Sequence, residues 1–232
     1  MRLDKMISST GIASRSQISS AVRSGRVLVD GVVARKADMQ VDPDAASVMY
    51  CGTPVCYRKF TYIMLNKPDG YVSATEDGRL PTVIELLPEE LQRIGLFPCG
   101  RLDKNTLGLM LLSNDGDTSH RLLAPKSHVA KTYAFCVKFP LSDADISALE
   151  SGVDIGGYIT APCRVERESE REGKITLTEG KYHQIKLMME AVHNQITYLE
   201  RVRFGPLTLD PALGRGQWRY LDDHEIALLQ KK

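Results

Sequence analysis

Three short motifs of this sequence each contain a side chain that could take part in chemistry. Asp103 lies in GRLDKNTLGLMLL, with a basic residue on either side and an apolar run directly after it. Tyr133 lies near the start of KTYAFCVKF, and Lys186 is the last residue of EGKYHQIK. An ionised carboxylate can act as a nucleophile, and a nearby lysine ammonium favours the charged form of such a carboxylate.

A structural role remains open for each of these residues. Asp103 could cap its loop or pair with Arg101, and the alternation around Tyr133 is also typical of a core aromatic residue. A glycoside hydrolase would need a second carboxylate across the cleft. Asp115 and Asp117 are near in sequence but look like turn residues, so that class of enzyme is poorly supported.

The sequence lacks the motifs of the common cofactor and metal enzymes. It contains no GxGxxG after a strand, no GxxxxGK[ST], no HExxH and no GxSxG. Its five cysteines are an odd number, and none of them are paired at the two-residue spacing of a zinc or redox site. We therefore expect neither a cofactor nor a metal site.

The reactive motifs lie in a region where strand and helix patterns alternate irregularly, which predicts an α+β domain with a largely antiparallel sheet. The strands are expected at residues 61–66, 71–75, 108–113, 131–139, 174–180 and 195–204, and the helices at 117–123, 141–152 and 182–193. In the alternating segment 131–139, Tyr133, Phe135, Val137 and Phe139 share one face.

Residues 1–48 have the pattern of a small module of helices and a hairpin. A helix is expected at residues 2–9, and residues 14–17 (SRSQ) have the spacing of a capping box that begins a second helix. Asp30-Gly31 separates two β-branched runs, which is a strong hairpin signal. Residues 49–59 lack periodicity and contain Gly and Pro, so we place the linker there. The predicted domains are therefore 1–56, the small module with its linker, and 57–232.

The first module is basic although the chain is nearly neutral. Residues 1–40 hold seven Lys or Arg against three Asp, whereas the whole chain has a formal net charge of +1. A basic module attached to a nearly neutral remainder indicates an anion-binding module, or simply a solvated surface.

The sequence also has no run of eighteen apolar residues and no signal-peptide core, so we expect a cytoplasmic protein without a membrane span.

The pattern RLDKxI, then GIASR and VRSGRVLVDG, resembles the small RNA-binding module first described in a small-subunit ribosomal protein. This resemblance covers about residues 1–48. It implies that the basic side chains of the module face RNA phosphates, where contacts give affinity with little sequence choice. The residues implied are Arg2, Lys5, Arg15, Arg23, Arg26 and Lys36.

The motifs LNKP, GRLD, KTY and EGKYHQIK, in this order, resemble the pseudouridine synthases of the RsuA type, which act on ribosomal RNA. The resemblance covers about residues 60–225 and implies an isomerase that needs no cofactor. It implies that Asp103 is the catalytic carboxylate, with Lys186 as its ionic partner and Tyr133 stacked on the uracil. The substrate-binding residues it implies are Arg101, Leu102, His183, Gln184 and Leu199.

The segments SHRLLAP and YHQIK resemble the small-subunit members of that family, which implies 16S ribosomal RNA as the partner, either free or in a partly assembled subunit. Nothing in the sequence asks for more than a monomer. A large-subunit site and a non-catalytic RNA-binding assembly factor remain alternatives. The sequence also leaves three roles open for Asp103, which could attack the ribose C1′, attack the uracil C6 or assist elimination at the sugar. For Leu199, core packing remains an alternative to contact with the base.

Overall fold

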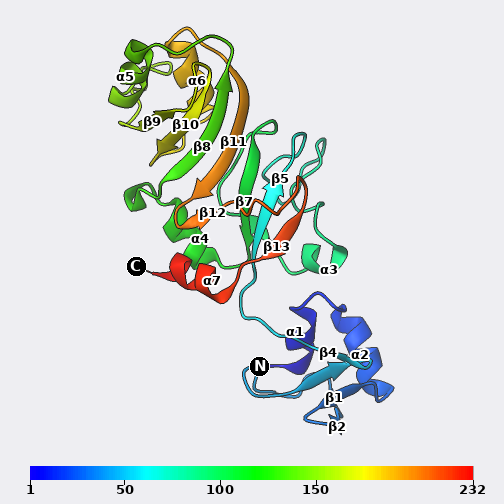
Figure 1. Ribbon diagram of the computed structural model, residues 1–232. Helices are drawn as coiled ribbons and strands as arrows, with labels where there is room; N and C mark the ends of the chain where they lie inside the picture. Colours follow the sequence, from blue (N-terminus) through cyan, green and yellow to red (C-terminus); the bar gives the residue numbers. More distant parts are fainter. Residues whose placement is uncertain (232) are drawn as a thin grey trace. The chain divides into compact units, whose positions relative to one another are not determined.

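The computed structural model describes residues 1–231 and divides into two compact units (Figure 1). The first unit contains Met1–Thr61 and Leu87–Leu96, and the second contains Tyr62–Leu86 and the chain from Phe97 onward. The assignment of residues 1–56 to an RNA-binding module with its linker, and of residues 57–232 to a catalytic domain, stays a prediction. Among residues 1–231, none of the helices combines the length and the apolar character needed to cross a bilayer.

The first unit packs two short helices on a small antiparallel sheet. The helices are α1 (Leu3–Ser8) and α2 (Arg15–Arg23), and the strands, in the order β2-β1-β3-β4, are β1 (Val27–Val29), β2 (Val32–Val33), β3 (Val48–Tyr50) and β4 (Thr53–Pro54). The capping box predicted before α2 is confirmed, because Ser14 and Gln17 bond each other's backbone amides. A short helix, α3 (Glu89–Gln92), also belongs to this unit.

Two tight hairpins build this sheet, and only one of them was predicted. Asp30 and Gly31 both have positive φ (53° and 78°), as a two-residue hairpin turn between β1 and β2 requires. Cys51 and Gly52 have the same backbone (50° and 84°) and join β3 to β4. The linker predicted at residues 49–59 is therefore wrong for the part that forms this hairpin. Its turn signal was weak because cysteine stands where Asn or Asp is usual.

The second unit is built on a nine-stranded sheet, in agreement with the predicted α+β class (Figure 1). The strand order is β13-β5-β7-β11-β8-β10-β9, with β6 on β7 and β12 on β11. The strands are β5 (Tyr62–Lys67), β6 (Phe97–Pro98), β7 (Leu107–Ser113), β8 (Lys131–Val137), β9 (Arg164–Arg167), β10 (Glu172–Leu177), β11 (Ile196–Phe204), β12 (Leu207–Thr208) and β13 (Trp218–Tyr220). The pairing of β11 with β7 is parallel and the other strand pairings described are antiparallel.

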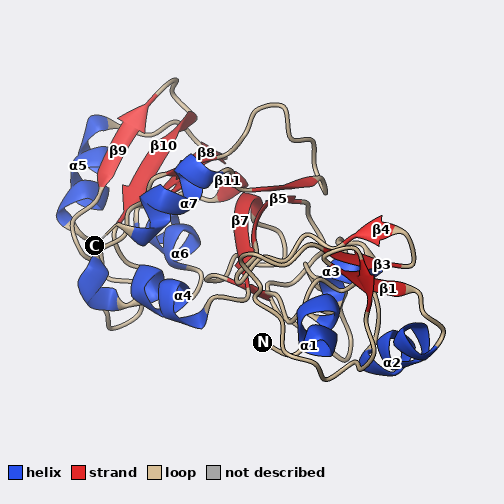
Figure 2. Ribbon diagram, turned by 90° about the horizontal axis from the view of Figure 1, so that it is seen from below, coloured by secondary structure: helices blue, strands red, loops and turns tan. Residues whose placement is uncertain are grey.

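Four α-helices accompany this sheet in the described chain: α4 (Gly116–Leu123), α5 (Asp143–Ser151), α6 (Gln184–Ala191) and α7 (Asp223–Gln230). Helix α5 lies beside β9 (Figure 2). Leu149 of this helix belongs to one buried apolar cluster with Ile175 of β10 and Met188 of α6. The buried Asp115 caps α4 and accepts a hydrogen bond from the Tyr62 hydroxyl, so this residue is more than a turn residue.

Three strand predictions differ from the structure, and the strand predicted at 174–180 is β10, which ends three residues earlier at Leu177. Residues 71–75 form no strand, because Val72 makes only an isolated bridge to Thr82 while Ser73 bonds a neighbouring loop. Segment 131–139 is a strand only as far as Val137, and Phe139 beyond its end is exposed. Alternating apolar residues thus correctly predicted the strand but overextended it by two positions.

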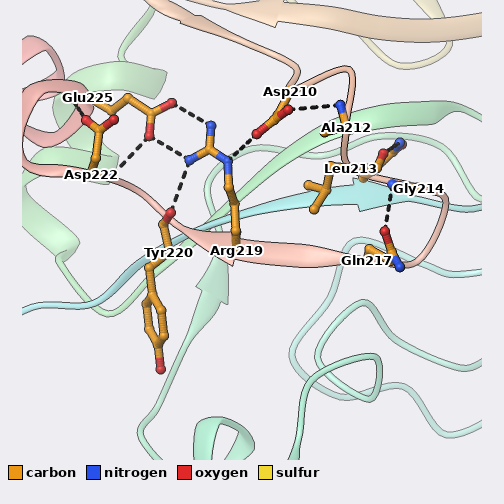
Figure 3. Close-up of polar contacts among 10 residues, drawn as sticks. Asp210, Ala212, Leu213, Gly214, Gln217, Arg219, Tyr220, Asp222 and Glu225 are labelled. Carbon is orange, nitrogen blue, oxygen red and sulfur yellow. Dashed lines mark hydrogen bonds and ion pairs between the residues drawn. The ribbon is translucent and has the colours of Figure 1, made fainter.

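Arg219 links the C-terminal elements of the second unit through hydrogen bonds and ion pairs (Figure 3). From β13 its guanidinium bonds Asp210 at 2.7 Å and Glu225 at 2.7 and 2.9 Å. Glu225 is also the partner of Asp222 in the capping box of α7. One arginine therefore ties β13, the loop after β12 and the last helix to each other.

Candidate active site

Asp103 lies on the loop between β6 and β7, directly before a buried strand. The backbone amide of Thr106 donates to the Asp103 carbonyl at 3.0 Å and closes a tight turn. Leu109 to Leu112, further along β7, are fully buried. This strand therefore anchors the loop, while the Asp103 side chain keeps 26% of its surface exposed to solvent.

Lys186 reaches Asp103 from the first turn of α6, although the two residues lie 83 positions apart in the sequence. Its Nζ lies 2.6 Å from Asp103 Oδ2 and 2.7 Å from Asn105 Oδ1. His183 Nε2 is 3.7 Å from the other carboxylate oxygen. Because the Lys186 side chain is only 21% exposed, the ion pair that it forms with Asp103 is partly shielded from solvent.

Tyr133 enters the same site from β8, where it is in register with Arg201 of β11. Leu199, also on β11, is buried and faces the same cavity. The cavity has a volume of about 530 Å³, within the usual range for small-molecule sites. It gathers the eight side chains predicted as catalytic or substrate-binding: Arg101, Leu102, Asp103, Tyr133, His183, Gln184, Lys186 and Leu199.

The residues predicted to bind RNA through the first unit are exposed there, but one of them also has a structural role. Arg2 forms a two-pronged ion pair with the buried Asp4, at 3.0 and 2.7 Å. The hydrogen bonds from Arg2 hold the pKa of the Asp4 carboxyl below its usual range, despite the opposing effect of burial. The remaining basic side chains of this group, exposed to solvent, are Lys5, Arg15, Arg23, Arg26 and Lys36.

A fully buried lysine beneath the Asp103 loop was not among the site residues predicted from the sequence. Lys67, the last residue of β5, is 0% exposed. Its ammonium donates to the carbonyls of Pro68 (3.0 Å), Lys104 (2.9 Å) and Thr106 (2.9 Å). Burial lowers the pKa of Lys67 to about 8, and the charges of Asp69 and Asp103 oppose that shift. A charged residue ending the apolar strand TYIMLNK was the signal available in the sequence.

The loop after β5 completes this support. The Ser73 hydroxyl donates to the Leu102 carbonyl at 2.8 Å and accepts from the Leu102 amide at 2.9 Å. The Gly70 amide donates to the Lys104 carbonyl at 3.1 Å. The backbone on both sides of Asp103 is therefore held by segment 67–73, which contains the end of the LNKP motif and the residues after it.

Arg201 is a second buried cation that was not among the predicted site residues. It is 1% exposed, donates to the Leu109 carbonyl at 2.8 Å and lies 5.0 Å from the Phe204 ring centroid. It lines the cavity together with Lys131, whose pKa is lowered by burial and by the charge of Arg201. The interior of the site is therefore positive, which suits an anionic or electron-rich ligand.

Gly108 permits the parallel contact that brings these strands together. It pairs with Lys67 on one side and with Arg201 on the other. With φ at +95°, a Cβ at this position would lie 2.4 Å from the Arg201 carbonyl oxygen. Only glycine lets β11 approach β7 this closely. Position 108 therefore controls how the Asp103 loop, before β7, lies relative to the site residues of β11.

Comparisons with known proteins agree with this geometry. A family model described as RNA pseudouridylate synthase matches residues 61–191, and one described as S4 domain matches residues 1–46. The chain is 48% identical to "Uncharacterized RNA pseudouridine synthase YtzG" of Bacillus subtilis, over 100% of this chain and 99% of that protein. It is 38% identical to "Ribosomal small subunit pseudouridine synthase A" of Escherichia coli, over 98% and 99%. A solved structure, "Crystal structure of pseudouridylate synthase", is 32% identical with a TM-score of 0.70 and covers 99% of both chains.

Proposed function

We propose that this chain, which belongs to the RNA pseudouridylate synthase family, isomerises one uridine of small-subunit (16S) ribosomal RNA to pseudouridine, with Asp103 as the catalytic carboxylate. The choice of RNA is supported by similarity over the whole chain to the small-subunit enzyme of Escherichia coli. We propose further that the enzyme acts in the cytoplasm as a monomer, on free RNA or on a partly assembled subunit.

The ion pair between Asp103 and Lys186 is the observation that supports this assignment most strongly. Two side chains distant in sequence meet at 2.6 Å inside a cavity that also receives Tyr133. A purely structural salt bridge would not need a cavity of this size at the carboxylate. The lysine ammonium would supply the counter-charge to the carboxylate when a bound nucleotide expels water from the site.

The proposed reaction breaks the bond between ribose C1′ and uracil N1, turns the base and forms a bond from C1′ to C5. The proton at C5 is lost and N1 gains one, so uridine and pseudouridine have the same atoms. Such a reaction requires neither a redox cofactor nor a metal ion. Asp103 would attack C1′, attack C6 or accept a proton from the sugar, and each route requires the carboxylate to be ionised.

The cavity wall suggests roles for the neighbouring side chains. Tyr133 would stack on the uracil, its hydroxyl serving as a proton acceptor, and Leu199 would form an apolar wall. Arg101, exposed at the same opening, would bind a backbone phosphate of the extruded nucleotide. His183, 3.7 Å from Asp103, would support the carboxylate from its other oxygen.

The buried cations suit the same chemistry. When the glycosidic bond breaks, negative charge develops on the departing uracil. Arg201 and Lys67 are both buried. Their charges would give the interior of the site a positive potential that stabilises this negative charge. Lys67 would in addition hold the loop that carries the catalytic acid.

The proposal is tested by mapping pseudouridine in both ribosomal RNAs from a strain that lacks this protein. We expect one position in 16S RNA to lose its modification, and expression of the wild-type chain to restore it. A chain carrying Asp103→Asn should not restore it. Loss of a large-subunit modification instead would overturn the substrate, and an unchanged pattern in both RNAs would favour an assembly factor.

A further inference from the structure

Tyr182 is an aromatic residue that the proposed chemistry leaves unused. Its side chain is 81% exposed, more than any other large apolar or aromatic side chain in residues 1–231. It nevertheless lines the cavity that holds Asp103 and Lys186. An aromatic ring at the edge of an RNA-modifying site, with most of its surface in water, is suited to contact with a ligand.

The Tyr182 ring contacts the ring of its neighbour in the sequence. It stacks on the His183 imidazole with the ring centroids 3.8 Å apart and the planes at 17°. His183 itself has a left-handed backbone (φ 50°, ψ 26°) at the start of α6. One face of Tyr182 is thus covered by His183, and its high exposure leaves the other face open.

The loop that carries these rings is anchored by a buried glutamine. Gln184 is 4% exposed; its Oε1 accepts from the Lys181 amide at 2.8 Å, and its Nε2 donates to Glu179 at 2.6 Å. Glu179 also accepts from the Tyr158 hydroxyl at 2.7 Å. These bonds organise the loop before any RNA arrives, so little conformational entropy is lost when a ligand binds to it.

A nucleobase fits this open ring. A uridine that enters the cavity must leave its RNA stack, and the base next to it then loses a stacking partner. Tyr182 lies at the edge of the cavity that the uridine would enter, and aromatic side chains stack on any base because every base has a π-face. Exposed Arg101 and Lys181 line the same cavity and can bind the phosphates between the two nucleotides.

We infer that Tyr182, backed by His183, is a stacking platform for the nucleobase immediately adjacent to the target uridine. The inference rests on the proposed function, because it assumes that a uridine occupies the cavity beside Asp103. The platform replaces the stacking that extrusion removes and so stabilises the opened RNA. It adds affinity without selecting one base over another.

The test is a double-mutant cycle between Tyr182 and the RNA. The probe is an rRNA fragment containing the mapped target uridine, with each flanking nucleotide replaced in turn by an abasic ribose. Binding is measured with the full-length chain carrying Asp103→Asn, so that no turnover intervenes. Tyr182→Ala is compared with Tyr182→Phe and with Phe139→Ala, which removes an exposed aromatic ring that does not line the cavity.

We expect Tyr182→Ala to weaken binding about 5- to 150-fold, the range for loss of one stacked base. Tyr182→Phe and Phe139→Ala should change binding by no more than about two-fold. When the protein retains Tyr182, an abasic ribose at one of the two flanking positions should weaken binding by the same factor as Tyr182→Ala does. When the protein carries Tyr182→Ala, the same abasic ribose should weaken binding little further. Unchanged binding by Tyr182→Ala, or losses that multiply at both flanking positions, would overturn the inference.

Product formation separates this inference from the proposed function. If the wild-type chain modifies a large-subunit uridine instead, the 16S assignment fails, but the cycle is run on that RNA and still decides the role of Tyr182. If it modifies neither RNA, both proposals fail. If it modifies 16S RNA and the cycle shows no coupling, only the platform is wrong.

Discussion

At the residue scale, the candidate site combines three side chains proposed to act on the substrate with polar groups that hold the Asp103 loop. Asp103, Tyr133 and Lys186 belong to motifs that resemble a known family, and the structure brings all three to one cavity. Lys67 and Ser73 act through backbone carbonyls and amides of the Asp103 loop. Their partners are main-chain atoms distant in sequence, which no side-chain pattern records.

The buried lysine provides the first prediction. Lys67→Met keeps the volume of the side chain but leaves three carbonyls without their donor. We expect the free energy of unfolding to fall by about 1–3 kcal/mol, the usual cost of unsatisfied buried polar groups. Because the Asp103 loop loosens, kcat should fall about 10- to 100-fold. Denaturant unfolding measures the change in stability, and steady-state kinetics measures the change in kcat. Lys138→Met, at an exposed site, is the control. Equal results for the two variants would contradict the role of Lys67.

The same lysine predicts a pH dependence. The pKa of Lys67 is lowered to about 8 in the folded chain, against 10.5 for an ordinary lysine. Between these values the unfolded chain binds more protons, so the contribution of Lys67 to stability should increase as pH rises from 8, and should be constant below it. The difference in unfolding free energy between wild type and Lys67→Met measures this contribution. A difference that does not change between pH 7 and 10 would show that the pKa is not lowered.

At the element scale, the elements with clear local signals were predicted and those that depend on tertiary contacts were not. The capping box at Ser14 and the alternation in β8 are signals within a few residues of chain. In contrast, β13 is three residues long and exists because it pairs with β5. The parallel contact of β7 with β11 spans two residue pairs and joins segments about ninety positions apart, so no local pattern could reveal it.

Gly108 tests this contact. Gly108→Ala would place a Cβ against the Arg201 backbone at a positive φ, so we expect a loss of about 1–3 kcal/mol in unfolding free energy and a fall in activity. Gly116→Ala is the matched control, since a Cβ there meets nothing within 4 Å at the start of α4. The control should be neutral or slightly stabilising. Thermal unfolding of both variants measures the effect, and equal melting temperatures would show that β11 can move away from β7 without cost.

At the scale of the whole molecule, two units with different chemistry make up one enzyme. The first presents basic side chains on short helices and hairpins, and the second holds a cavity with buried cations. Composition predicted the basic first unit. It did not predict that residues 87–96, in the middle of the catalytic sequence, belong to the compact unit formed by residues 1–61. That assignment depends on tertiary contacts.

The role of the first unit is tested through salt dependence. Arg15→Gln with Arg23→Gln removes two exposed charges from α2, and we expect weaker RNA binding with a salt slope smaller by about 1 to 2 units, because fewer counterions are released. Lys138→Gln with Arg171→Gln, two exposed charges of the second unit, is the control. Binding constants at several salt concentrations give the slopes. An unchanged slope in the α2 variant would mean that these arginines are only a solvated surface.

The isomerisation is proposed to depend on the Asp103 carboxylate, which is held by Lys186. The most direct test is to incubate Asp103→Asn with 16S RNA and to measure pseudouridine and RNA affinity on the same samples. Asparagine keeps the shape of the side chain but cannot ionise. We expect no detectable pseudouridine from Asp103→Asn and an RNA affinity within about five-fold of wild type, since an amide oxygen can still accept a hydrogen bond from Lys186. Pseudouridine formed by Asp103→Asn at a rate near that of wild type would show that the Asp103 carboxylate is not required.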